Sequence, residues 1–229
     1  MFILDQISLE LCPKKIESAI FQGNTPKVDW SEKVQTAIEQ ISPILHPSAV
    51  YDLFEVNKVE NECLSLSRPD LKHIEIIYIG PNVVLLNRAQ LIVISVVTLG
   101  ENLDARIASM NDAGQIAEGY LFDRVGVYAL LQASRAVYHQ VERLAETRGF
   151  GVGSVMSPGA IIGWPIEEQG RLCSLLPLNR IGVRLNSSGM LIPLKSVLFL
   201  VGIGTLYSSK KVEVPCQVCT NEGACWCKY

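Results

Sequence analysis

The chain has 229 residues, of which 48% are hydrophobic and 19% are charged, a composition typical of a packed globular protein rather than a disordered chain. Its 20 Lys and Arg residues are outnumbered by 23 Asp and Glu residues, and the formal charge of −3 argues against a general nucleic-acid binder. The mean hydropathy is high, at +0.25, but the most apolar stretch, residues 91–99, is far shorter than the roughly 20 residues of a membrane-spanning helix. We therefore expect a buried strand there and no membrane span.

The N-terminus carries acidic residues early, at Asp5 and Glu10. It has no basic start and no small-residue cleavage site, so it does not resemble a secretory signal. We expect a cytoplasmic protein whose cysteines are reduced unless they bind metal. Three scattered cysteines, Cys12, Cys63 and Cys173, stand among apolar residues and are interpreted as small buried hydrophobes.

The first third of the chain predicts one helix and two strands. Apolar residues at helical spacing predict a helix over residues 33–44, with Ser31 as its cap. Residues 49–66 are rich in β-branched and aromatic side chains. They predict two strands joined by a turn near residues 57–62.

The middle of the chain predicts a strand followed by helices. Residues 71–78 fit either a short helix or a strand, and Gly80-Pro81-Asn82 predicts a turn. A strand is expected to end near Leu99, and a helix to begin at residues 100–103. Residues 111–149 predict a long helix, because apolar or small residues recur on one face. That predicted face comprises Val127, Leu130, Leu131, Ser134, Val137, Tyr138, Val141 and Leu144.

Glycine and proline dominate residues 149–165, which we interpret as a loop that begins where Gly149 stops the helix. A dinucleotide-binding interpretation of Gly149, Gly151 and Gly153 is disfavoured, since such glycines follow a strand and open a helix. The later part of the loop is rigid and poor in side chains, so it could present backbone groups to a small polar ligand. The candidate binding residues are Ser157, Pro158, Gly159, Ala160, Gly163 and Trp164.

The last third predicts a short helix over residues 167–176 and strands over 181–185, 190–193 and 197–204. Helices and strands are grouped along the chain rather than strictly alternating. The sequence therefore predicts an α+β fold with an antiparallel or mixed sheet and flanking helices.

Four cysteines cluster near the C-terminus in the pattern C-x2-C-x5-C-x-C, as Cys216, Cys219, Cys225 and Cys227. Four thiolates this close together suit a [4Fe–4S] cluster, with zinc as the alternative. Uncoordinated or disulfide-linked thiols in a loose tail are the third possibility. We expect an α+β domain over residues 1–209 and a cysteine-rich tail over residues 210–229.

Residues 97–204 resemble the activation (reactivation) domain of vitamin B12-dependent methionine synthase, in a stand-alone form. No single motif is decisive, but the order and spacing of several short motifs make the resemblance specific. Residues 45–70 match more loosely, and residues 1–45 are weakly matched. The motifs are Thr98-Leu99-Gly100, Leu103-Asp104, the helix over 123–136, Ser157-Pro158-Gly159, Trp164-Pro165-Ile166-Glu167-Glu168-Gln169, Arg180-Ile181-Gly182-Val183, Ser187-Ser188-Gly189-Met190-Leu191-Ile192-Pro193 and Lys195-Ser196-Val197.

The resemblance implies a curved α+β domain that binds S-adenosylmethionine in a shallow groove. It also implies docking over a corrinoid, a cobalamin carried by a partner protein, whose cobalt has fallen to the inactive Co(II) state. A separate electron donor reduces the cobalt, and S-adenosylmethionine then methylates it. The domain supplies the positioning of the methyl donor, and the redox chemistry belongs to the corrinoid.

This sequence departs from the family pattern at two positions of the loop. The family has an Arg that anchors the methionine carboxylate and a Tyr that lines the site, whereas this chain has Val155 and Ala160. Valine lacks the bidentate contact that arginine makes with a carboxylate, so S-adenosylmethionine binding stays open.

The leading interpretation is an accessory protein that reactivates a corrinoid protein, either methionine synthase or a corrinoid methyltransferase. The alternative is an iron–sulfur or zinc module for electron transfer that has lost S-adenosylmethionine binding. A third possibility is a domain that only interacts with a corrinoid protein and performs no catalysis.

Overall fold

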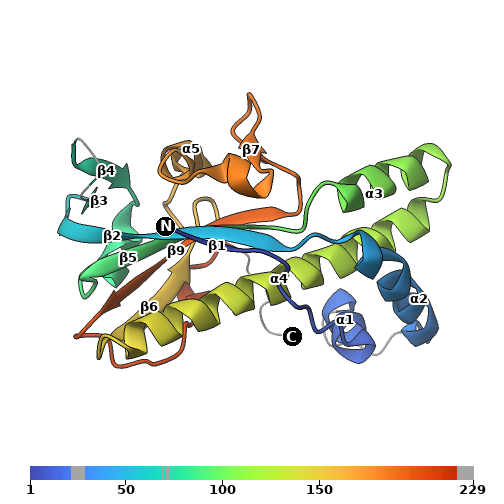
Figure 1. The fold of residues 1–229 in the computed structure, drawn as a ribbon, viewed down its shortest axis with the longest axis horizontal. Helices are drawn as coiled ribbons and strands as arrows, with labels where there is room; N and C mark the ends of the chain where they lie inside the picture. Colours follow the sequence, from blue (N-terminus) through green and yellow to red (C-terminus); the bar gives the residue numbers. More distant parts are fainter. Residues whose placement is uncertain (22–28, 69, 71–72, 221–229) are drawn as a thin grey trace.

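The computed structural model describes residues 1–21, 29–68, 70 and 73–220. Its main sheet has the strand order β4-β3-β2-β5-β9-β6, and β1 is added beside β2. Neighbouring strands of this sheet are all antiparallel, which confirms the predicted α+β class with an antiparallel sheet (Figure 1). The strands are β1 (Phe2–Leu4), β2 (Ser48–Glu60), β3 (Cys63–Ser67), β4 (Glu75–Tyr78), β5 (Leu91–Thr98), β6 (Gly151–Met156) and β9 (Ser196–Gly204).

Strand β5 lies in the middle of the sheet, between β2 and β9. All its residues except Leu91 are buried, which confirms the buried strand predicted over residues 91–99. Successive side chains point to opposite faces of a strand, so Val93 and Val97 pack on one face while Ile92 and Ile94 pack on the other. The sheet therefore separates two hydrophobic cores.

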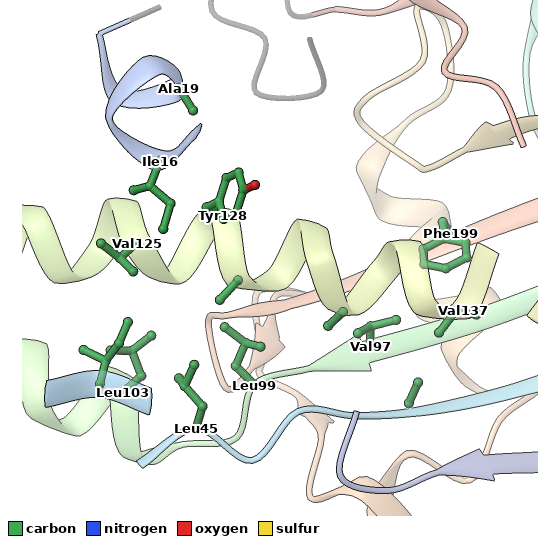
Figure 2. Packing of buried hydrophobic residues seen from close by; sticks show 14 of the residues in the cluster. Ile16, Ala19, Leu45, Val97, Leu99, Leu103, Val125, Tyr128, Val137 and Phe199 are labelled. Atoms are coloured by element: carbon green, nitrogen blue, oxygen red, sulfur yellow. The ribbon is translucent and has the colours of Figure 1, made fainter. Parts of the chain in front are cut away.

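Helices cover one face of the sheet and form what we call the helix-side core (Figures 1 and 2). The long helix α4 (Ile116–Glu146) lies along the sheet, and α1 (Pro13–Ile20) and α2 (Ser31–Ile41) pack beside it. Helix α3 (Asn102–Asp112) packs on the N-terminal part of α4. Figure 2 shows Val97 and Phe199 of the sheet facing Val137 of α4.

The prediction of a long helix is confirmed, with a turn at residues 113–115 separating α3 from α4. The predicted apolar face is rotated relative to the observed one. Ala129 and Ala133 are fully buried, whereas Val127 and Leu131 are half-buried. Small residues let a helix approach a sheet closely, and a search for large apolar side chains misses them.

The other face carries a second core, which we call the α5-side core. It is covered by short elements rather than by a long helix (Figure 1). The predicted helix over 167–176 is confirmed as a short 3-10 turn followed by α5, and the predicted hairpin after it is also present. These elements are η3 (Ile166–Glu168), α5 (Gln169–Cys173), η4 (Leu178–Ile181), β7 (Arg184–Leu185) and β8 (Leu191–Ile192).

The predictions for the first third are largely confirmed. Strands β2 and β3 form the expected pair, with the turn at Asn61 and Glu62, both in the left-handed region. Ser31 was expected to cap a helix, but α2 begins at Ser31 itself, whose hydroxyl instead donates to Glu17. Of residues 71–78, the structure assigns 75–78 to strand β4, while 71 and 72 lie outside the described residues.

The prediction of a loop over residues 149–165 is wrong for residues 151–156, which form strand β6 on the edge of the sheet. A β-carbon on Gly151 would lie 2.1 Å from the carbonyl oxygen of Tyr207, and one on Gly153 would lie 2.9 Å from the Tyr207 ring. These glycines therefore let the chain after β9 pass close to β6. Gly149 does stop α4, in the left-handed conformation at φ +69.

The Tyr207 side chain also lies close to a glycine of the neighbouring strand β9. A β-carbon on Gly202 of β9 would lie 2.7 Å from the Tyr207 hydroxyl. That hydroxyl donates a hydrogen bond of 2.8 Å to the carbonyl oxygen of Leu85, and burial raises the pKa of Tyr207 to about 12. Tyr207 thus ties the chain after β9 to the 3-10 helix η2 (Pro81–Leu86).

In the part of the chain that the structure describes, no helix has the length and apolar character that crossing a bilayer requires.

Gly151→Ala is expected to lower the free energy of unfolding by about 1–3 kcal/mol, because the methyl group must displace the backbone at Tyr207. Gly170→Ala in α5 is the matched control, since its nearest atom lies 4.0 Å away, at the Leu185 side chain. In a helix this change is expected to be neutral or to stabilise by up to about 1 kcal/mol. Chemical denaturation measures both values, and equal stabilities of the two variants would contradict the close approach.

Candidate functional site

The loop over residues 157–164 follows β6 and is closed by its own backbone. The N–H of Ala160 donates to the carbonyl of Ser157 at 3.2 Å, and the N–H of Gly159 donates to the carbonyl of Trp164 at 2.9 Å. Gly159 and Gly163 both adopt positive φ angles, +75 and +82, which glycine does without steric cost. The structure thus brings the six predicted binding residues together in one compact turn.

Burial divides this loop into anchors and an outer surface. Pro158 and Trp164 are buried, and the Trp164 ring is part of the α5-side core. Gly159, Ala160 and Gly163 are exposed. Trp164 is 2% exposed, and its Nε1–H finds no acceptor among the described residues. Trp164 therefore anchors the loop, and its outer surface consists of exposed backbone together with the Ile162 side chain, which is 49% exposed.

The turn before η2 braces the loop from a distant part of the sequence. The side-chain amide of Asn82 donates to the carbonyl of Ile162 at 2.7 Å. A β-carbon on Gly80 would lie 2.2 Å from the carbonyl oxygen of Gly163, and one on Gly163 would lie 2.8 Å from the Pro81 ring. The predicted Gly80-Pro81-Asn82 turn is confirmed, and its interlocking with the loop gives the loop a fixed shape.

After β9 the chain returns along the free edge of β6. The N–H of Val152 donates to the carbonyl of Ser209, and the N–H of Val155 donates to the carbonyl of Glu213, both at 2.9 Å. These bonds satisfy backbone groups that an edge strand otherwise leaves unpaired. The first part of the cysteine-rich segment is thereby attached to the sheet.

A carboxylate on α4 anchors this returning segment. Glu142 accepts hydrogen bonds from the Lys211 ammonium at 2.8 Å and from the N–H of Val212 at 3.0 Å, and His139 Nδ1 lies 3.1 Å away. Burial alone would raise the pKa of Glu142, but these three partners outweigh it and hold the pKa below its usual value. The sequence shows no pattern that pairs Glu142 with Lys211 and Val212.

The segment then reaches the loop and pairs with it. We call residues 216–220 the strap. The N–H of Ile162 donates to the carbonyl of Val218 at 2.8 Å, and the N–H of Thr220 donates to the carbonyl of Ala160 at 3.0 Å. The Thr220 hydroxyl also donates to the carbonyl of Gly159 at 3.1 Å. The two sequence features singled out as functional, the loop and the cysteine segment, are therefore neighbours in space.

The predicted metal ligands fall partly within the strap. Cys216 is exposed and Cys219 is half-buried, whereas Cys225 and Cys227 lie outside the described residues. Within the described ranges, no three His, Cys, Asp or Glu side chains are grouped to hold a metal ion. The four-thiolate site for a [4Fe–4S] cluster or zinc stays a prediction.

The three scattered cysteines differ in burial. Cys173 is buried as predicted, and its burial raises the pKa of the thiol to about 12, so it behaves as a small hydrophobe. Cys12 and Cys63 are only half-buried, so the expectation of full burial is wrong for these two.

The two positions that depart from the family pattern lie in different surroundings. Val155 is half-buried and packs against the helix-side core, while Ala160 is exposed on the loop. Four cavities of about 390 to 660 Å³ lie elsewhere in the described chain, and none is lined by a loop residue. With the strap in place, the N–H of Ile162 and the carbonyls of Gly159 and Ala160 are bonded to the strap.

No protein-family model matches the sequence, and no curated protein matches it significantly. Among solved structures, the chain is similar to the MetH reactivation domain bound to AdoHcy, with a TM-score of 0.58 and 12% sequence identity. The likeness covers 92% of this chain and 81% of that chain. At this identity it shows the fold alone. The fold class that the resemblance implies, that of a methionine synthase reactivation domain, is confirmed.

Glu142→Gln is expected to lower the free energy of unfolding by about 1 kcal/mol at neutral pH, because the neutral amide cannot form the charge-assisted hydrogen bonds that the carboxylate accepts. The pKa of Glu142 is lowered on folding, so its contribution is fully present above the unfolded pKa and is lost as pH falls through the folded pKa. The stability difference from the wild type should therefore shrink below about pH 4. Urea denaturation at several pH values measures it, and a difference that is constant with pH would be the contrary result.

Proposed function

We propose that this protein is an accessory factor for the reductive reactivation of a corrinoid protein, such as methionine synthase or a corrinoid methyltransferase. The single observation that carries the proposal is the fold, shared over 92% of the chain with a reactivation domain solved with AdoHcy. The braced loop over residues 157–164 supports it, because it holds backbone groups at a fixed place on the surface.

The proposed ligand of this loop is an S-adenosyl compound. The exposed loop carries one backbone donor, the N–H of Ile162, and two backbone acceptors, the carbonyls of Gly159 and Ala160. A donor beside two acceptors suits the carboxylate and ammonium of an amino-acid end. When bound, S-adenosylmethionine supplies a sulfonium methyl group to the cobalt of the partner's corrinoid.

The proposed metal site is the tail, with Cys216 and Cys219 and the further thiols of Cys225 and Cys227. Thiolates suit an iron–sulfur cluster or zinc, and a [4Fe–4S] cluster would supply a low-potential electron. The clustering of four thiols within twelve residues of the tail supports this. The same proposal includes an external electron donor as a further partner and the cytoplasm as the compartment.

A second candidate function is an electron-transfer or interaction module of a corrinoid system that no longer binds S-adenosylmethionine. Two observations favour it. Val155 packs into the helix-side core in place of the expected arginine, and the strap already bonds with the loop backbone. The two functions differ in whether an S-adenosyl compound binds.

Isothermal titration calorimetry with S-adenosylhomocysteine distinguishes the two candidate functions. We expect saturable binding to the full chain. Ala160→Tyr should tighten it by roughly three- to tenfold, the effect of one added aromatic contact of about 1 kcal/mol. Ala105→Tyr, at an exposed position of α3, should leave it unchanged. The absence of binding to both the wild type and Ala160→Tyr would reject the ligand and favour the second function.

Measurement of bound metal tests the proposed metal site in the tail. After anaerobic reconstitution with iron and sulfide, we expect about four iron atoms per chain and cluster absorbance. Cys216→Ser and Cys219→Ser should abolish both, and Cys63→Ser on β3 should not. Stoichiometric zinc in the purified protein would support the zinc alternative, and no bound metal under either condition would reject the site.

A further inference from the structure

The strap and the loop form a short antiparallel ladder with a defined register. The two hydrogen bonds between Ile162 and Val218 and between Thr220 and Ala160 flank the pair Ile161 and Cys219. This makes Ile161 and Cys219 a non-hydrogen-bonded pair, in which the Cα atoms lie closest, at about 4.5 Å, and the side chains are near each other. The strap therefore sits on the loop in a single specified alignment.

The strap bonds with the same loop backbone groups that we propose to bind the ligand. The strap supplies an acceptor to the N–H of Ile162, and it supplies donors to the carbonyls of Gly159 and Ala160. A zwitterionic amino-acid end needs the same donor and acceptors. Because a backbone group in such a ladder is already satisfied, the strap and the ligand compete for it.

The strap is held weakly compared with the rest of the chain. Cys216, Gln217 and Thr220 are exposed, and Val218 is the residue that packs against the α5-side core. Two backbone hydrogen bonds join it to the loop, and the Thr220 hydroxyl donates to the carbonyls of Gly159 and Ala160 at 3.1 and 3.4 Å. Segments with few buried contacts and exposed hydrogen bonds open at low free-energy cost.

We propose that residues 216–220 are an autoinhibitory strap, which must lift from the loop before an S-adenosyl compound can bind there. This inference rests on the proposed function, because it assigns a regulator to the same site. The observed affinity then equals the intrinsic affinity multiplied by the fraction of molecules with the strap open. Weakening the strap tightens binding, and fixing the strap abolishes it.

A disulfide can fix the strap reversibly. In Ile161→Cys, the new thiol faces Cys219 across the non-hydrogen-bonded pair, within the reach that a disulfide requires. Diamide takes up the two thiol hydrogens as the S–S bond forms, and dithiothreitol reverses the reaction. Peptide mapping identifies the bond between position 161 and Cys219, and circular dichroism confirms that the variant is folded.

The test measures S-adenosylhomocysteine binding by titration. Oxidised Ile161→Cys is expected to lose at least tenfold in affinity and to regain it on reduction, while wild type treated with diamide serves as control. Thr220→Pro removes the donor to Ala160 and the hydroxyl bond to Gly159, so it should bind about tenfold more tightly than wild type. Gln217→Ala, whose exposed side chain forms no described hydrogen bond, is the matched control in the strap and should bind as wild type does.

Two contrary results have different meanings. Equal affinities of the oxidised and reduced Ile161→Cys protein, with the disulfide verified, would overturn the strap while leaving the proposed ligand intact. No binding to wild type, to reduced Ile161→Cys and to Thr220→Pro would reject the ligand, and the inference with it. Removal of residues 216–229 provides a second opening variant and should match Thr220→Pro.

Discussion

The free edge of β6 is the constraint on which the site depends. An edge strand leaves a row of N–H and C=O groups unpaired, and this chain satisfies part of that row with its own segment after β9. Gly151 and Gly153 make this possible, because any β-carbon there would collide with Tyr207. The segment is then held by Glu142 and delivered to the loop that follows β6. The segment after β9 thus both covers the edge of β6 and positions the strap on the loop.

The same arrangement explains why the loop is rich in glycine and proline. Its buried residues anchor it in the α5-side core, and the turn at Gly80 packs closely against Gly163 of the loop. What remains exposed is backbone and the Ile162 side chain, so the loop surface carries no charged side chain. The arginine that the family pattern expects is replaced by Val155, which packs on the opposite face of the sheet. The proposed binding through this loop would be sensitive to any segment that competes for its backbone groups.

Much of the fold could be predicted from the sequence. Strand β5, the long helix and the β2–β3 pair follow from apolar periodicity and turn residues, which are local signals. The resemblance led to the correct fold class, and that class is confirmed by a solved reactivation domain at 12% identity. Local patterns were sufficient where an element is long and strongly apolar.

The errors arise where distant contacts override local signals. Residues 151–156 look like a loop because of their glycines, yet those glycines are needed for a strand that lies against Tyr207. The face of α4 is rotated because Ala129 and Ala133, rather than larger residues, approach the sheet. The strap has no sequence signature, since Thr220 and Ala160 are sixty positions apart and pair through a backbone hydrogen bond.

In the native protein, the strap forms backbone hydrogen bonds with the loop. Amide hydrogen exchange followed by NMR measures this directly at the N–H groups of Ile162 and Thr220. We expect both amides to be protected, with exchange slowed at least about tenfold relative to an unstructured peptide. Exchange of both amides at the unstructured rate in the full chain would contradict it.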